Sequence, residues 1–100
     1  MTLEVLSEAL AELNDSIAYY EGQHRGLGER FLAEVASTIE FAVENPQLGS
    51  SLPPPATAVR KFVVHRFPFV VLIARNDSVT RVVGITHTSR RHGYWLDRIK

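Results

Sequence analysis

The residues of this chain best suited to bind an anion or an acidic partner lie near its C-terminal end. Arg90 and Arg91 are adjacent, and each guanidinium can donate forked hydrogen bonds to a carboxylate or a phosphate. Tyr94 and Trp95 follow and offer rigid, amphipathic contact area. Arginine, tyrosine and tryptophan most often dominate binding energies at interfaces, so this run favours recognition of another macromolecule.

The histidines do not form the pattern of a metal site. His24, His65, His87 and His92 lack the i, i+4 helical spacing and the neighbouring carboxylates typical of zinc sites. We therefore predict neither a metal nor another cofactor. His87 and His92 flank the arginine pair and titrate near neutrality, so they could act as acid or base. Ser89 has no acidic residue placed to orient such a base, which argues against a catalytic triad.

Acidic and basic residues are segregated along the chain. Residues 1–45 contain nine acidic residues and two arginines, whereas residues 59–100 contain nine basic residues and two aspartates. The net charge is zero, yet the two parts carry −7 and +7. Clustered like charge attracts a partner of opposite charge, so we expect the C-terminal part to carry the function.

Length and composition predict one domain spanning residues 1–100. A chain of this length, 45% hydrophobic, can bury a core without metals or disulfides. It has no cysteine, which suits a reducing compartment, and we expect a cytoplasmic protein. The first residues do not resemble a signal peptide, and no apolar run approaches the ~18 residues of a membrane span.

The N-terminal part predicts an antiparallel helical hairpin, preceded by a short strand over residues 2–6. Apolar residues recur every three or four positions in two stretches, which are Leu6, Ala9, Leu10, Leu13, Ile17 and Tyr20, then Leu27, Phe31, Leu32, Val35, Ile39, Ala42 and Val43. The segment from Gly22 to Gly28 interrupts this pattern, and Pro46 ends it near Asn45. Acidic residues on the opposite faces are expected to be solvated, among them Glu8, Glu12 and Glu40.

The C-terminal part predicts a loop and a sheet. Residues 46–58 include three consecutive prolines and are expected to lack regular structure. Strand-like runs follow at residues 59–65, 69–75 and 79–86, and the middle run is apolar at both parities, as in a central strand. The fold class is therefore α+β, in the order β-α-α-β-β-β. We expect the helices on one face of an antiparallel meander, with the other face partly open and rich in arginine.

Short motifs in a fixed order accompany these elements. They are Ala18-Tyr19-Tyr20, Gly26-Leu27-Gly28-Glu29-Arg30-Phe31, Val59-Arg60-Lys61-Phe62, Arg66-Phe67-Pro68-Phe69 and His87-Thr88-Ser89-Arg90-Arg91-His92-Gly93-Tyr94-Trp95. Together with the helical hairpin and the proline-bearing loop, they resemble the RelE/ParE superfamily of type II toxin–antitoxin toxins. The first two motifs resemble its ParE-like branch. The similarity spans nearly the whole chain.

The resemblance implies a small toxin that a cognate antitoxin neutralises. A ParE-like toxin inhibits DNA gyrase, for which it needs only a surface that binds and traps the gyrase–DNA complex. A RelE-like toxin is instead a metal-independent endoribonuclease that cleaves messenger RNA on the ribosome. A third alternative is a binding module that retains the fold without toxicity.

RNA cleavage requires a group that activates the 2′-hydroxyl, a donor for the leaving oxygen and cations for the phosphate. The resemblance aligns the five positions that supply these groups with Lys61, Val63, Val70, Thr88 and Tyr94. Three of the five lack the required charge, so we favour the non-enzymatic function. Basic residues at neighbouring positions could replace the missing charges, and an endoribonuclease would then use Lys61, Arg81, Arg90 and Tyr94.

The predicted target-binding residues are basic or aromatic, namely Arg60, Lys61, Arg90, Arg91, Tyr94 and Trp95. Trp95 could equally pack the chain end onto the sheet, because a lone tryptophan in a small domain is usually a core residue. The spacing of Trp95 and Ile99 indicates a helical turn over residues 94–99.

The antitoxin that the resemblance implies is an acidic and apolar segment that folds on binding, within a toxin–antitoxin hetero-oligomer. We expect it to cross the groove between the helices and the basic strands. Its candidate contacts are Leu27, Leu52, Phe67 and Phe69.

Overall fold

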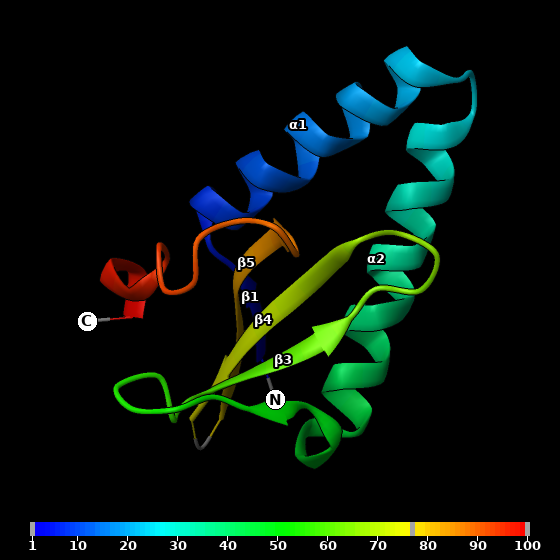
Figure 1. Cartoon of the computed structure of the whole chain (residues 1–100). Helices are drawn as coiled ribbons and strands as arrows, with labels where there is room; N and C mark the ends of the chain where they lie inside the picture. The colour runs from blue at the N-terminus through cyan, green and yellow to red at the C-terminus, as the bar shows by residue number, and fades with distance from the viewer. Residues whose placement is uncertain (1, 77, 100) are drawn as a thin grey trace.

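The computed structural model describes residues 2–76 and 78–99 and consists of two helices and a five-stranded sheet (Figure 1). In chain order the elements are β1 (Thr2–Val5), α1 (Ser7–Gln23), α2 (Leu27–Glu44), the 3-10 turn η1 (Pro46–Leu48), β2 (Ser50–Ser51), β3 (Val59–Val63), β4 (Phe69–Arg75), β5 (Val79–His87) and the 3-10 turn η2 (Leu96–Ile99). The strand order is β1-β5-β4-β3-β2. The α+β class is therefore confirmed.

The helical hairpin forms as predicted, and one carboxylate stabilises its turn. Gly26 has a φ of 87°, a conformation that glycine adopts without strain. Glu21, near the end of α1, accepts the N–H groups of Gly26 and Gly28, each at 3.0 Å. A side chain of the first helix thus satisfies donors at the N-terminus of the second. No helix in the described part of the chain is long and apolar enough to cross a membrane.

Gly28 lies where the two helices approach closely, and its replacement by alanine is expected to destabilise the hairpin. A Cβ atom there would lie 2.7 Å from the Ile17 carbonyl oxygen, a backbone atom that moves only with its helix. We expect Gly28→Ala to lower the free energy of unfolding by about 1–3 kcal/mol. Gly22→Ala is the control, because nothing lies within 4 Å of its added Cβ in α1. Urea denaturation should show Gly22→Ala to be neutral or stabilising by about 0.5–1 kcal/mol; equal losses would contradict the close approach.

The sheet is mixed, although its larger part is the predicted antiparallel meander. Strands β3, β4 and β5 pair antiparallel in sequence order. Strand β1 joins the sheet in parallel with β5, so that Thr2 lies opposite Val79 and Val5 opposite Val82. The N-terminal strand therefore lies at one edge of the sheet, and the helical hairpin is the connection that leads away from this edge.

The prediction that residues 46–58 lack regular structure is wrong for the first part of this segment. Pro46–Leu48 form a 3-10 turn, and Ser50–Ser51 pair with β3 as a two-residue edge strand. Arg60 of β3 supplies a reason, because its Nη1 donates a hydrogen bond to the Gly49 carbonyl at 2.8 Å. This bond fixes the segment beside β3 at the point where backbone pairing begins.

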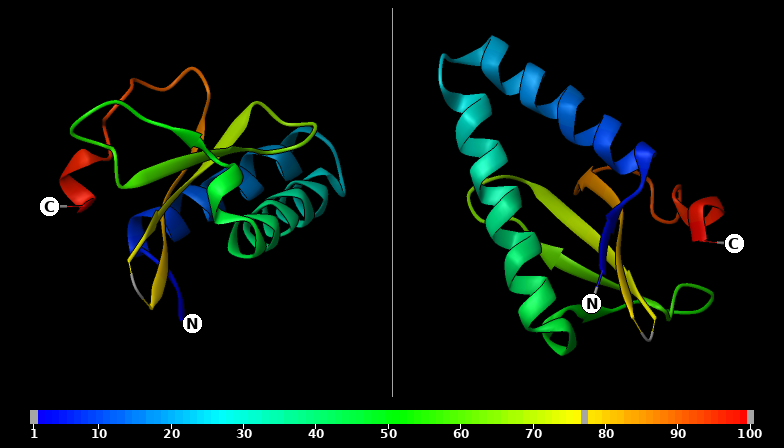
Figure 2. Two further views of the ribbon diagram at one scale, coloured as in Figure 1. Left: turned by 90° about the horizontal axis from the view of Figure 1, so that it is seen from below. Right: turned by 180° about the vertical axis from the view of Figure 1, so that it is seen from behind.

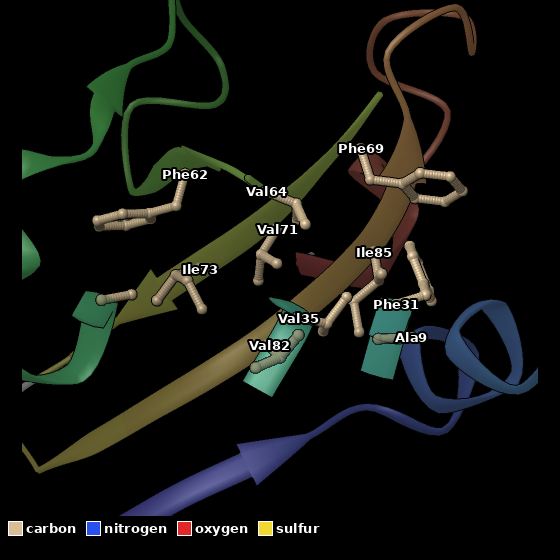
Figure 3. Packing of buried hydrophobic residues seen from close by; sticks show 11 residues of the cluster. Ala9, Phe31, Val35, Phe62, Val64, Phe69, Val71, Ile73, Val82 and Ile85 are labelled. Atoms are coloured by element: carbon tan, nitrogen blue, oxygen red, sulfur yellow. The ribbon is translucent and has the colours of Figure 1, made fainter. Parts of the chain in front are cut away.

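One face of the sheet packs against both helices and forms the main core, shown in Figure 3. Alternate residues of β4, Phe69, Val71 and Ile73, lie on this face, as the two-residue period of a strand requires. Phe31 and Val35 of α2 are completely buried against them. The middle strand is buried on both faces over most of its length, as predicted.

Two apolar residues of the helices lie outside this core. Leu10 and Leu32 are 47% and 42% exposed, although the helical periodicity placed them on the packed faces. That part of the prediction is wrong because the hairpin contacts the sheet along a narrow stripe. The buried positions of α2 are Gly28, Phe31, Val35, Thr38 and Ala42.

Irregular chain covers the opposite face of the sheet, which the sequence predicted to be partly open. Two segments lie there, on the side away from the helices in Figure 2. We call residues 52–58 the proline loop and residues 88–99 the C-terminal arm. Beneath them lies a second cluster of buried residues, consisting of Ala56, Val59, Val70, Leu72, Val83 and Trp95.

Candidate binding pocket

The C-terminal arm turns back over the sheet at Gly93. The φ of Gly93 is 77°, and the N–H of Leu96 donates to the Gly93 carbonyl at 3.0 Å to begin η2. The predicted helical turn is thus present as a 3-10 turn. Trp95 is 6% exposed and packs on the second cluster. The alternative in which Trp95 packs the chain end onto the sheet is therefore confirmed.

The proline loop forms a wall that faces the arm. The N–H of Ala56 donates to the Pro53 carbonyl at 2.9 Å, and the N–H of Val59 donates to the Ala56 carbonyl at 3.0 Å. Two successive turns therefore lead the chain into β3. Leu52 and Ala56 pack on the same cluster as Trp95. Because proline restricts φ, this wall has few alternative conformations.

A pocket of about 550 Å³ lies between the arm and the loop. Val70 and Leu72 of β4 supply apolar surface at its base, and basic side chains stand around it. None of the described residues that line it is acidic. This combination suits a partner that offers an apolar group flanked by carboxylates or phosphates. The lining residues are Leu52–Ala56, Lys61, Val70, Leu72, Thr86–Thr88 and Arg90–Leu96.

An aromatic ring restricts the orientation of Arg90. Its guanidinium carbon lies 4.0 Å from the centroid of the Tyr94 ring, within the range of a cation–π interaction. Arg98 lies 5.0 Å from the same centroid. Arg90 and Arg91 are both exposed at the pocket. The arm thus presents two guanidinium groups to solvent, and the first of them rests on a fixed ring.

The hydroxyl of Tyr94 donates a hydrogen bond to Oε2 of Glu12 in α1. Burial, together with this hydrogen bond, raises the pKa of Tyr94 above its ordinary value of 10.0. A phenol that is already bonded and difficult to ionise is poorly suited to activate a 2′-hydroxyl. The bonding of Tyr94 therefore fits a binding role better than a catalytic one.

His87 also lines the pocket, and its hydrogen bonds define its tautomer. Its Nδ1 accepts the backbone N–H of Ser89 at 3.0 Å. Because a backbone N–H can only donate, the proton of the neutral ring lies on Nε2, from which His87 can donate to an anion. Among the described residues, no group of three or more histidine, aspartate or glutamate side chains is placed to bind a metal ion.

The structure brings together five of the six predicted target-binding residues, namely Lys61, Arg90, Arg91, Tyr94 and Trp95. Arg60 lies elsewhere, because it shares a face of β3 with Phe62 of the main core. Arg81, predicted for RNA cleavage, forms an ion pair with Glu4 at 2.9 Å and does not line the pocket. The four residues proposed for cleavage are therefore not assembled at one site.

The predicted antitoxin contacts are largely turned inward. Phe69 is 7% exposed in the main core, and Phe67 packs against that core with its ring centroid 5.1 Å from that of Phe31. Leu52 contacts the second cluster, and Leu27 is half-buried. These four side chains therefore offer little free surface to a partner.

Other apolar side chains are better placed to contact a partner. Phe41, Leu48 and Val63 are 48%, 60% and 71% exposed. They line a groove of about 310 Å³ between α2 and β3. Periodicity did not single out these residues, because Leu48 lies in a turn and Val63 at the end of a strand.

Two further residues near the pocket were not predicted, Glu12 and Arg98. Their side chains are 14% and 15% exposed and form an ion pair at 3.0 Å, and the bond to Glu12 raises the pKa of Arg98. The prediction that Glu12 is solvated is therefore wrong. The sequence contained one signal, because Glu12 lies one helical turn from Ala9 and beside Leu13, on the flank of the apolar stripe.

Comparison with known proteins agrees with this architecture. Residues 3–92 match the family of the ParE toxin of type II toxin–antitoxin system, parDE. A solved structure described as the chromosomal ParDE TA system from P. aeruginosa has a TM-score of 0.71 and 17% identity, covering 87% of this chain and 95% of that one. No protein with a curated description matches the sequence.

The fold is that of the RelE/ParE superfamily, with a helical hairpin on one face of a mixed sheet. The family match covers most of the chain, so the chain belongs to the ParE toxins of type II toxin–antitoxin systems. The resemblance read from the sequence motifs, including its ParE-like branch, is thereby confirmed.

Proposed function

We propose that this chain inhibits DNA gyrase without catalysing a reaction, by binding the gyrase–DNA complex through the pocket between the proline loop and the C-terminal arm. The observation that carries the proposal is the composition of this pocket. The floor of the pocket is apolar, and Lys61, Arg90 and Arg91 surround it. None of the described residues that line the pocket is acidic. An apolar side chain flanked by carboxylates or phosphates would match both features.

Trapping a complex requires affinity alone, and the pocket is better equipped for affinity than for cleavage. The family resemblance aligns Val63 and Val70 with positions where the RNA-cleaving branch has charged residues. Tyr94 is bonded to Glu12, and Arg81 to Glu4. A RelE-like endoribonuclease would have to replace each of these groups with another, so we treat cleavage as an alternative outcome of the experiment below.

We further propose that a cognate antitoxin binds the groove between α2 and β3 and neutralises the toxin in the cytoplasm. The exposed side chains of Phe41, Leu48 and Val63 supply apolar contact area there. An antitoxin segment with apolar and acidic residues would bury this area and meet basic groups of the neighbouring strands. Lys61 lines both the pocket and the groove, whereas the other lining residues of the two sites differ, so an antitoxin in the groove would meet the target-binding surface at this one residue.

Controlled expression in bacterial cells tests the target. We expect the DNA-damage response and cleaved gyrase–DNA complexes to appear before any loss of protein synthesis, because a trapped topoisomerase leaves broken DNA. The measurement follows a damage-responsive reporter and amino-acid incorporation in the same culture. Co-expression of the antitoxin is the control that should suppress both signals. Prompt arrest of translation with fragmented messenger RNA would favour the endoribonuclease, and undisturbed growth would favour a non-toxic binding module.

A further inference from the structure

Strand β5 lacks a strand neighbour over part of its outer edge. Its partner β1 ends at Val5, opposite Val82, and the chain then turns into α1. Beyond this point, the Val83 carbonyl accepts a hydrogen bond from Arg98 Nη1 at 3.0 Å. The Ile85 N–H donates to Glu12 Oε1 at 3.1 Å. Two side chains therefore satisfy backbone groups that a longer β1 would have paired.

These two side chains also bind each other. Nη1 and Nη2 of Arg98 donate to Oε1 and Oε2 of Glu12 at 3.0 and 3.2 Å, which is the forked geometry that makes such pairs directional. The pair lies directly beside Gly84, because a Cβ atom at that position would be in ordinary van der Waals contact, at 3.6 Å, with both Arg98 Nη1 and Glu12 Oε1. Helix α1, strand β5 and the C-terminal arm are thus joined at one half-buried carboxylate.

The network continues from Glu12 to the pocket through one ring. Oε2 of Glu12 accepts the Tyr94 hydroxyl, which fixes one end of that side chain. The guanidinium of Arg90 rests on the same ring, 4.0 Å from its centroid. Glu12 itself does not line the pocket. Its hydrogen bond to Tyr94 connects it to the pocket lining and, through the ring, to Arg90.

We propose that Glu12 is a positioning residue of the target-binding surface, which orients Tyr94 and thereby sets the direction in which Arg90 meets a partner. The inference rests on the proposed function, because it concerns the same pocket. It assigns a specific task to one acidic side chain of the N-terminal part. Loss of the Glu12 carboxylate should therefore free the Arg90 guanidinium even where the fold persists.

Nitrogen-15 NMR of the whole chain tests this directly. In the unchanged protein, the Nε–Hε resonance of Arg90 should be shifted upfield by the ring current of Tyr94. In Glu12→Gln, which retains the size of the side chain, the resonance should move to the position of an unstacked arginine. Glu8→Gln is the matched control, because Glu8 is exposed one turn earlier in α1 and loses the same charge. We expect no change at Arg90 in this control.

Toxicity supplies the second measurement. The inducer concentration needed to halt growth should rise about tenfold for Glu12→Gln and remain unchanged for Glu8→Gln.

Two results would overturn the inference. One is an Arg90 resonance in folded Glu12→Gln at the same position as in the unsubstituted protein, and the other is an Arg90 side chain released from the Tyr94 ring with full toxicity. If Glu12→Gln does not fold, Tyr94→Phe decides the question, since it removes only the hydroxyl. A freed Arg90 would then support the inference, and an unchanged one would overturn it. The NMR result does not depend on gyrase. A failure of the proposed function would be seen separately, as a lack of toxicity or of gyrase inhibition by the protein without substitutions.

Discussion

Replacement of Phe31 with alanine is expected to lower the free energy of unfolding by about 3–5 kcal/mol. Phe31 is completely buried in α2, and its ring centroid lies 5.1 Å from that of Tyr20 and 4.8 Å from that of Phe69. The ring thus contacts both the first helix and the sheet, so its loss would leave a cavity between the two layers. A domain of this size has only about 5–15 kcal/mol of stability, so the fraction of folded protein should fall sharply at growth temperature.

Phe41→Ala in the same helix is the control for this prediction. Phe41 is 48% exposed, and its nearest aromatic partner is Phe62, with centroids 6.3 Å apart. We expect its removal to cost about 1 kcal/mol or less, because only part of the ring leaves water on folding. Urea denaturation of both variants measures the difference. Similar losses in the two variants would show that the ring cluster around Phe31 does not join the layers as described.

The parts of the fold that local sequence determines were predictable. The apolar periodicity of the two helices and Pro46 fixed the hairpin and its end, and α2 does end at Glu44. The alternating and continuous apolar runs likewise located the three strands of the meander. The proximity of Arg90, Arg91 and Tyr94 also followed from the sequence, because these residues lie within five positions of one short arm, but the pocket that they line did not.

What depends on contacts between distant residues was not predictable. The strand Ser50–Ser51 exists because Arg60 binds the Gly49 carbonyl, and neither serine has a strand-like pattern of its own. Glu12 resembles any solvated glutamate of an amphipathic helix until Arg98, far along the chain, meets it. The sequence also did not predict that the C-terminal arm covers the second face of the sheet, because the arm lacks a regular spacing of apolar residues that would indicate a packed face.

Reversal of charge at both Arg90 and Arg91 is expected to abolish toxicity while leaving the fold intact. Both side chains are exposed at the pocket, so Arg90→Glu, Arg91→Glu removes no core contact. Two carboxylates beside the apolar floor of the pocket would repel the anionic groups of the target that the arginines attract in the original protein. Arginines central to an interface commonly contribute about 2 kcal/mol or more each, so we expect affinity for the target to fall at least ~100-fold. Of the two single variants, Arg90→Glu should have a larger effect than Arg91→Glu, because Arg90 is the arginine whose guanidinium rests on the Tyr94 ring.

The control for this double variant must change the net charge equally at a distance from the pocket. Arg25 in the turn between the helices and Arg75 at the end of β4 are both exposed, and neither lines the pocket. Arg25→Glu, Arg75→Glu should therefore retain toxicity, measured as colony formation after induction, with thermal unfolding to verify that both double variants fold. If both double variants lose toxicity equally, overall charge rather than the pocket governs target binding. If neither does, the arginine pair is not part of the target-binding surface, and the contact must lie on another face of the toxin.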